Sequence, residues 1–188
     1  DYKRKLRKAF VILDHRERSD IILNDAKNLA FAHGLDLIND DALLEEVSGL
    51  VEWPVTLLGE VNNAFFDLPT EVLRASMKEH QKFFSLKNSK TKKIERFITV
   101  ANIETADNGA TILEGNQKVL YARLSDAKFF WENDLRLIQK DGLDVWLEKL
   151  KNVTFHNKLG SQADKVSRIS ALTKKLVSPL ACDGEAAV

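Results

Sequence analysis

Residues 68–102 read LPTEVLRASMKEHQKFFSLKNSKTKKIERFITVAN, and their hydrophobic period changes partway along the stretch. Apolar side chains in the first half recur at helical spacing, and Pro69 suits the first turn of a helix. The second half holds two runs typical of strands, FFSL and FITVA, on either side of a polar turn. The stretch therefore predicts a helix followed by a β-hairpin near residues 82–101, and we expect this hairpin to be central to a sheet.

Upstream of this stretch the pattern is mostly helical. One amphipathic helix is predicted to end at Gly34, and the next is capped by Asn39 or Asp40. The apolar run at residues 10–13 fits either a strand or a buried helix. Val55–Gly59 is apolar and β-branched, which predicts an interior strand of the sheet.

Downstream of the hairpin the pattern is again helical. A long helix is predicted over roughly residues 110–137, and Gly115 marks a kink or a join between two helices. A short helix follows at 143–150, then a link at 153–156, then a last helix capped by Ser161. The predicted fold class is α+β, predominantly helical, with a small mixed or antiparallel sheet and a helical C-terminal part.

The composition is that of an ordinary soluble globular chain. The 188 residues are 44% hydrophobic and 30% charged, and 28 basic side chains balance 28 acidic ones, so net charge alone makes no case for nucleic-acid binding. The single cysteine, Cys182, excludes an internal disulfide and fits a reducing compartment. We find neither a long apolar run nor a signal-peptide pattern, and therefore expect a cytoplasmic protein without a membrane segment.

Motifs that carry chemistry are missing from the sequence. Neither G-x-x-x-x-G-K-[ST] nor G-x-G-x-x-G occurs, so no phosphate-binding glycine loop is predicted. His15, His33, His80 and His156 lie far apart and lack the spacing of metal ligands. Cys182 is interpreted as a spectator thiol. No catalytic residue and no metal site are predicted.

Three polar clusters have both a structural and a functional interpretation. Residues 78–82 close a helix, where their cations either offset the helix dipole or contact RNA or another ligand. Arg123 and Asp126 are three apart on one helical face, which favours an ion pair over a binding role. Residues 156–161 precede a helix, and Lys158 with the open helix N-terminus either meets a phosphate or belongs to an ordinary capped helix.

Five ordered segments resemble the beta subunit of bacterial glycyl-tRNA synthetase. They are LLEEVSGLVEWPV (43–55), LPxEVLxxSMKxHQKFF (68–84), FIxVAN (97–102), GNQKVLxARLSDAxFFWExDL (115–135) and VTFHNKLGSxxDKxxRI (153–169). The resemblance extends from about Val11 to Leu176. One departure is the turn at residues 89–93, SKTKK, where that family commonly has a glycine-containing hairpin turn.

The resemblance implies an internal fragment of the beta chain of an α2β2 aminoacyl-tRNA synthetase, a glycine-tRNA ligase that joins glycine to its tRNA at the expense of ATP. In that family the aminoacylation site, which uses ATP with Mg²⁺, lies on the alpha subunit, and the beta subunit recognises tRNA. The fragment is therefore expected to hold no cofactor of its own. Its expected partners are the alpha subunit, tRNA(Gly) and the rest of the beta chain.

The resemblance also implies a domain organisation. Residues 1–150 are similar to the editing-type domain of the phenylalanyl-tRNA synthetase beta chain, in an α+β middle region. Residues 151–188 are a linker and a helix that lead toward a truncated HD-type helical domain.

Candidate nucleic-acid-binding residues are the basic and polar side chains of the matched segments that have no catalytic partner in sequence. They are Lys78, His80, Gln81, Lys82, Arg123 and Lys158. Two other functions stay open. One is an editing-like hydrolase of mischarged tRNA, with His80 or Asp126 as the base. The other is a subunit-interface scaffold that makes no RNA contact.

Overall fold

The computed structural model describes residues 2–180, which divide after Trp131 into two compact units. Cys182, interpreted as a spectator thiol, lies outside the described residues. The domain boundary expected at residue 150 stays a prediction. No helix within residues 2–180 has the length and the apolar character needed to cross a membrane.

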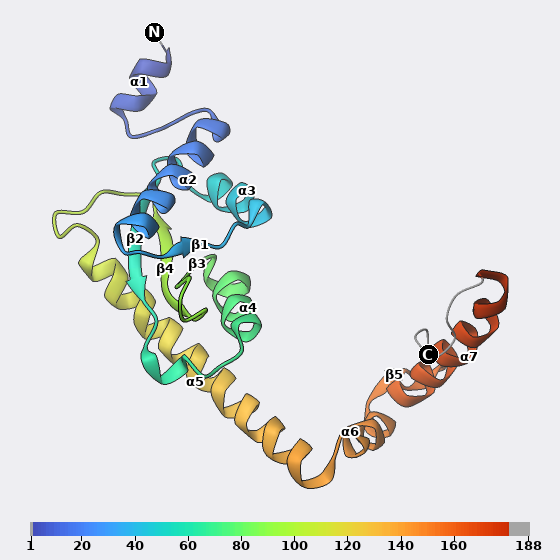
Figure 1. The fold of residues 1–188 in the computed structure, drawn as a ribbon. Helices are drawn as coiled ribbons and strands as arrows, with labels where there is room; N and C mark the ends of the chain where they lie inside the picture. Colours follow the sequence, from blue (N-terminus) through green and yellow to red (C-terminus); the bar gives the residue numbers. More distant parts are fainter. Residues whose placement is uncertain (1, 181–188) are drawn as a thin grey trace. The chain divides into compact units, whose positions relative to one another are not determined.

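The N-terminal unit is built on an antiparallel sheet of four strands in the order β1-β3-β4-β2 (Figure 1). The strands are β1 (Asp36–Leu37), β2 (Val55–Glu60), β3 (Phe84–Lys87) and β4 (Ile94–Ala101). The hairpin predicted near 82–101 is confirmed, and its strands β3 and β4 are the two central ones. The interior position predicted for Val55–Gly59 is wrong, because β2 pairs with β4 alone and forms an edge of this sheet.

Helices flank the sheet and follow most of the predicted boundaries. Those of this unit are α1 (Tyr2–Lys8), α2 (His15–Ala32), α3 (Asp41–Leu50), the 3-10 turn η1 (Asn63–Phe65), α4 (Thr70–Gln81) and α5 (Ala110–Asp141), which continues into the second unit. Asp40 and not Asn39 caps α3, since its Oδ1 accepts a hydrogen bond from the N–H of Leu43 at 3.0 Å. Residues 11–14 form neither strand nor helix, and α5 is one continuous helix through Gly115.

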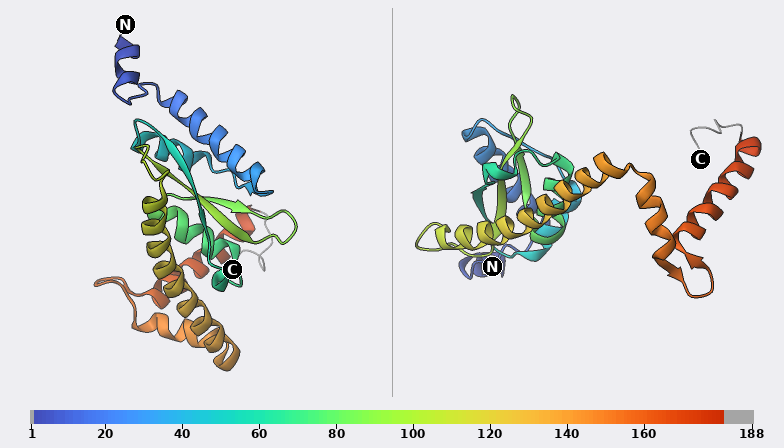
Figure 2. Two further views of the ribbon diagram at one scale, coloured as in Figure 1. Left: turned by 90° about the vertical axis from the view of Figure 1, so that its left-hand side faces the viewer. Right: turned by 90° about the horizontal axis from the view of Figure 1, so that it is seen from below.

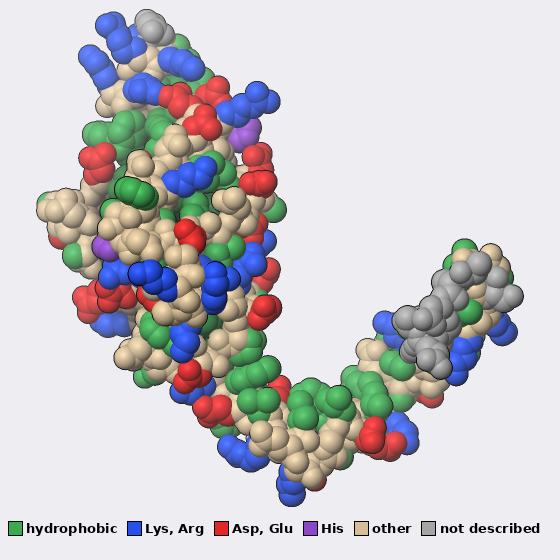
Figure 3. Space-filling view, viewed as in Figure 1, with side chains coloured by type: hydrophobic (Ala, Val, Ile, Leu, Met, Phe, Trp, Pro, Cys, Tyr) green, Lys and Arg blue, Asp and Glu red, His purple; other side chains and the backbone are tan. Residues whose placement is uncertain are grey.

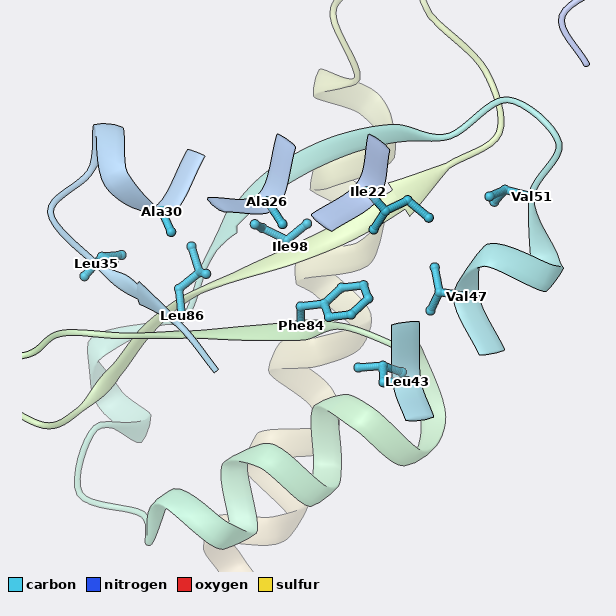
Figure 4. Close-up of a cluster of buried hydrophobic side chains, with 10 residues drawn as sticks. All are labelled: Ile22, Ala26, Ala30, Leu35, Leu43, Val47, Val51, Phe84, Leu86 and Ile98. Carbon is cyan, nitrogen blue, oxygen red and sulfur yellow. The ribbon is translucent and has the colours of Figure 1, made fainter. Parts of the chain in front are cut away.

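Helices α2 and α3 cover one face of the sheet. The buried side chains of this first core meet between the two helices and the strands (Figure 4). They are Ile22, Ala26, Ala30, Leu35, Leu43, Val47, Val51, Phe84, Leu86 and Ile98. Phe84 and Leu86 are two apart on β3 and therefore point to the same face.

Helices α4 and α5 cover the opposite face with a second core. Its buried members are Val61, Phe65, Leu68, Leu73, Met77, Phe83, Ile94, Phe97, Leu120 and Leu124. Phe97 precedes Ile98 on β4, so strand alternation places the two residues in different cores. Phe97 is fully buried and stacks on Phe83 with ring centroids 4.4 Å apart. Packing in this core fixes the relative position of α4 and α5.

The C-terminal unit contains the end of α5, followed by short elements and one long helix. These are α6 (Asp144–Lys149), the 3-10 turn η2 (Leu150–Asn152), β5 (Thr154–His156), β6 (Gly160–Ser161) and α7 (Gln162–Leu180). The segment predicted as a link is a strand, because Thr154–His156 pairs antiparallel with β6. Ser161 caps α7 as predicted: its Oγ accepts from the N–H of Asp164 at 3.2 Å, and Asp164 Oδ2 accepts in return from the N–H of Ser161 at 2.8 Å. The predicted α+β class, predominantly helical with a small antiparallel sheet, is confirmed.

Candidate nucleic-acid interface

Two of the predicted contact residues, Lys78 and Lys82, are held by carboxylates from another part of the chain. Lys78 Nζ lies 2.7 Å from Oδ2 of Asp40, and Lys82 Nζ lies 2.8 Å from Oε1 of Glu46. Both lysine side chains are about one-third exposed, at 36% and 32%. Each ammonium group would have to leave an ion pair before it could bind a phosphate.

The carboxylate of Asp40 connects three elements. One oxygen caps α3, and the other accepts a hydrogen bond from Lys78 and lies 3.9 Å from Arg74 Nη2. Burial raises the pKa of Asp40, but the hydrogen bonds from Lys78 and from the Leu43 N–H, together with the two positive charges, lower it below its ordinary value. Asp40 is therefore ionised at neutral pH, and Lys78 stabilises it.

The end of α4 is shaped by backbone geometry. Lys82 has φ 57° and ψ 37°, the left-handed conformation, and its N–H donates to the carbonyl of Lys78 at 3.2 Å. This is the usual way to end a helix and turn the chain into a strand. Gln81 is half-buried, and its side-chain oxygen is enclosed without a hydrogen-bond donor among the described residues. Gln81 and Lys82 thus end α4 and turn the chain toward β3.

His80 and Arg123 lie together in a shallow groove between α4 and α5. The groove has a volume of about 290 Å³ and is lined by Ala75, Ser76, Glu79, His80, Arg123 and Asp126. Leu73 and Met77 of α4 pack in one core with Leu120 and Leu124 of α5, and the lining side chains stand on the outer faces of the same helices. Side chains 43 positions apart are thereby brought to one surface, which no local sequence pattern reveals.

The groove offers hydrogen-bond donors with no fixed partner. Both His80 and Arg123 are exposed, and within residues 2–180 neither takes part in an ion pair. The ion pair that the spacing of Arg123 and Asp126 favoured is not formed. A guanidinium group with free donors suits a phosphate oxygen, while the carboxylates of Glu79 and Asp126 can accept from ribose hydroxyl or base amino groups. The groove can therefore donate hydrogen bonds to the phosphates of an RNA strand and accept hydrogen bonds from its ribose or base groups.

Lys158 belongs to the C-terminal unit and lies in the turn between β5 and β6. The side chain is exposed, and the backbone N–H of Lys158 donates to Nδ1 of His156 at 3.1 Å. The nearby N-terminus of α7 is already capped by Ser161 and Asp164, so that end of the helix is not an open anion site. A phosphate would meet Lys158 through its ammonium group. The RNA contacts proposed for all six residues stay predictions.

The N-terminal segment, which the sequence predicts as a basic helix from Tyr2 to Ala9, was not among the predicted contacts. Helix α1 carries Lys3, Arg4, Lys5, Arg7 and Lys8 and no acidic residue, and Lys and Arg side chains gather over it in Figure 3. Arg7 is paired with Glu17 of α2. The local excess of basic residues is what would have pointed to this surface, and it is hidden when the 28 basic and 28 acidic residues of the whole chain are summed.

Comparison with known proteins shows the family. Residues 1–187 match the family described as glycyl-tRNA synthetase beta subunit. The chain is 61% identical over 188 residues to the glycine–tRNA ligase beta subunit of Ruegeria sp. (strain TM1040), covering 100% of this chain and 27% of that protein. It is 57% identical over 187 residues to the same subunit of Paracoccus denitrificans (strain Pd 1222), covering 100% of this chain and 27% of that protein. The chain thus spans about a quarter of the length of these relatives. It belongs to the glycyl-tRNA synthetase beta-subunit family.

Proposed function

We propose that this chain supports tRNA recognition in a glycine-tRNA ligase, in which glycine is joined to tRNA(Gly) with ATP at a site on the alpha subunit. The relatives are named for a ligase of glycine and tRNA, and their designation as a beta subunit implies a partner subunit. Cytoplasmic localisation is part of the same proposal, because tRNA charging serves protein synthesis.

The arrangement of the α4/α5 groove is the observation that carries the proposal. Of the basic side chains predicted to contact RNA, Arg123 and His80 share a surface and keep their donors free, whereas Lys78 and Lys82 are engaged. A free guanidinium group on a rigid helix can bind a phosphate without first breaking an internal contact. His80 and Arg123 are therefore the predicted residues that share one surface and can contact tRNA without giving up an ion pair.

The direct test is a titration of tRNA(Gly) against the full-length enzyme at several salt concentrations. Arg123→Ala is expected to weaken binding and to reduce the slope of log affinity against log salt by about 0.7–0.9, the contribution of one phosphate contact. Lys118→Ala is the matched control, because Lys118 is an exposed cation on the same helix that pairs with Glu114 at 2.7 Å. An unchanged slope for Arg123→Ala would remove the groove from the RNA surface.

An editing-like hydrolase is the second candidate, favoured by the presence of His80 and Asp126 in one groove. Hydrolysis would require a base that activates a water molecule, but no hydrogen bond joins these two side chains in the described part of the chain. Incubating mischarged tRNA with the beta subunit alone separates the two functions. Release of the amino acid, lost in His80→Ala, would support the hydrolase.

A subunit-interface scaffold is the third candidate, and it is favoured by the C-terminal unit. None of the side chains described between residues 132 and 180 is fully buried. Exposed apolar side chains recur along α7 at Val166, Ile169, Leu172 and Leu176. If this surface packs on the alpha subunit, amide hydrogen exchange in α7 will slow only when alpha is added.

No cofactor is proposed for these residues themselves. Among residues 2–180, no three His, Cys, Asp or Glu side chains are grouped so that they could hold a metal ion. In the proposed activity ATP and Mg²⁺ are bound by the alpha subunit, and the groove described here would act on tRNA only.

A further inference from the structure

A second pocket lies on the N-terminal unit, next to the first residues of β4 in the β3–β4 hairpin. It has a volume of about 610 Å³, within the range of about 300–1,000 Å³ typical of small-molecule sites. Its walls come from the end of β2, from η1, from the start of β4 and from the middle of α5. None of its lining residues belongs to the α4/α5 groove, so it is a separate site.

Aromatic rings form much of the wall of this pocket. Phe65 is buried and meets Tyr121 edge to face, with ring centroids 5.2 Å apart and an interplanar angle of 67°. Tyr121 is 52% exposed, so part of its ring faces solvent. Phe66 is half-buried on the same wall, and Lys93 Nζ lies 5.9 Å from its ring centroid. Exposed rings fixed at a concave surface are the usual platform for stacking an unpaired base.

The polar groups of the pocket suit the edge of a base and not a phosphate. Asn63 and Gln117 supply side-chain amides, which both donate and accept hydrogen bonds. Glu60 is paired with Arg96 at 2.8 Å, and Glu95 accepts a hydrogen bond from the hydroxyl of Thr91 at 2.9 Å. Because the guanidinium group of Arg96 is already paired with Glu60, the pocket keeps no free cation for a phosphate among the described residues that line it, and its carboxylates can accept hydrogen bonds from base amino groups.

The hairpin turn beside the pocket carries the opposite charge. Lysines stand at positions 87, 90, 92 and 93, with no acidic residue between them. The turn projects beyond the sheet in both views of Figure 2. Its shape is fixed by Asn88, whose side-chain oxygen accepts from the N–H of Lys90 at 2.9 Å and from the N–H of Thr91 at 3.2 Å. Lys90 and Lys92 make no ion pair among the described residues, whereas Lys93 reaches Asp67 at 3.3 Å.

We infer that this pocket binds one unstacked base of a single-stranded RNA segment, with the adjoining phosphates lying against the hairpin lysines. The aromatic and amide-rich interior takes the base, and the cationic turn takes the phosphates of the backbone. The choice of RNA as the ligand rests on the tRNA-related function proposed above. The site itself follows from the aromatic wall and the position of the lysines beside it.

The test uses the full-length beta subunit and single-stranded RNA pentanucleotides with a central 2-aminopurine, whose fluorescence falls when it stacks on an aromatic ring. Tyr121→Ala is expected to weaken binding roughly 5- to 150-fold, the range for losing one stacked base, and to restore the fluorescence. The salt dependence of the remaining binding should not change. Phe129→Ala is the matched control, because Phe129 is a 66% exposed aromatic residue on the same helix outside the pocket.

Lysine variants test the second half of the site. Lys90→Gln and Lys92→Gly should each reduce the salt slope of pentanucleotide binding by about 0.7 while leaving the fluorescence quench of the bound state in place. Glycine is chosen at position 92 because Lys92 has φ 61°. Lys118→Ala should leave pentanucleotide binding unchanged, because Lys118 is paired with Glu114 and lines neither pocket. The α4/α5 groove is read separately by the tRNA titration of Arg123→Ala, so failure of this site and failure of that groove give different results.

Two outcomes would overturn the inference. One is that the wild-type subunit neither binds the pentanucleotides nor quenches 2-aminopurine. The other is that Tyr121→Ala binds and quenches as the wild type does. Should Tyr121→Ala fail to fold, Tyr121→Phe is expected to bind like the wild type, and photo-crosslinking of a 4-thiouridine pentanucleotide to the wild type should label the peptides that contain Phe66 or Tyr121. Labelling elsewhere would contradict the site.

Discussion

Lys78 Nζ and Asp40 Oδ2 lie 2.7 Å apart and join the end of α4 to the cap of α3. The same carboxylate holds the first turn of α3 through its other oxygen. A lysine in a polar helix end can look like a ligand contact in sequence and yet be part of the internal structure. Basic residues of α4 and α5 thus fall into two groups. Some, such as Lys78, are paired inside the fold, and others, such as Arg123, keep hydrogen-bond donors free for a ligand.

Removing the charge of Asp40 is expected to lower stability in a pH-dependent way. Asp40→Asn keeps a good cap for α3 but loses the ion pair, whereas Asp40→Ala loses both and should be about 1 kcal/mol less stable than Asp40→Asn. Because folding lowers the pKa of Asp40, the extra stability of the wild type over Asp40→Asn is present above the unfolded-state pKa of about 3.9 and is lost as the pH falls through the folded-state value.

Urea unfolding at pH 7 and at pH 3 measures this difference. An advantage of the wild type that grows at acid pH would contradict the assignment, because it would require a carboxyl group whose pKa is raised on folding.

Lys82 should tolerate glycine better than alanine. Its left-handed backbone is unfavourable for any residue with a β-carbon, and both substitutions lose the ion pair with Glu46 equally. Lys82→Gly is therefore expected to be about 1 kcal/mol more stable than Lys82→Ala. Thermal unfolding of the two variants side by side is the measurement, and a more stable alanine variant would show that this residue does not end α4 in the left-handed conformation.

Two glycines should respond oppositely to alanine. A β-carbon at Gly59 would overlap the ring of Phe97, which is fully buried against Phe83, so Gly59→Ala should destabilise by about 1–3 kcal/mol. Gly115 lies inside α5 with no heavy atom within 4 Å of an added β-carbon, and Gly115→Ala should stabilise by about 0.5–1 kcal/mol. Denaturant midpoints of both variants check the pair. Equal effects at the two positions would mean that β2 and β4 do not pair as described.

The hairpin could be predicted because its signals are local. Residues 84–87 and 94–101 alternate between two cores, and the polar turn between them is short. The edge position of β2 could not be predicted in the same way. An apolar run in the sequence indicates that the faces of a strand are covered, as those of β2 are by helices. It does not indicate whether another strand pairs along each edge of that strand.

The short strand β5 was not predicted from the sequence. Its three residues, Thr154–His156, are all exposed, and so short a run does not establish a strand pattern in the sequence. Its pairing with Gly160 and Ser161 is a property of the tight turn, which positive φ at Gly160 permits.

The candidate sites were predictable only in part. His80 and Arg123 were identified as donors from their segments, but their meeting in one groove depends on how α4 and α5 pack. The partners of Lys78 and Lys82 lie 38 and 36 positions away, at Asp40 and Glu46, so neither ion pair leaves a trace in the local sequence. The aromatic pocket was missed because Phe65 and Tyr121 come from distant segments.

The most direct test compares Arg123→Ala with Lys78→Met in the complete enzyme, through the salt dependence of tRNA(Gly) affinity. If exposed donors of the α4/α5 groove contact RNA and the paired lysine does not, Arg123→Ala will reduce the slope by about 0.7–0.9. Lys78→Met will lower stability and leave the slope unchanged. The reverse result, a reduced slope for Lys78→Met and a wild-type slope for Arg123→Ala, would contradict the proposed interface.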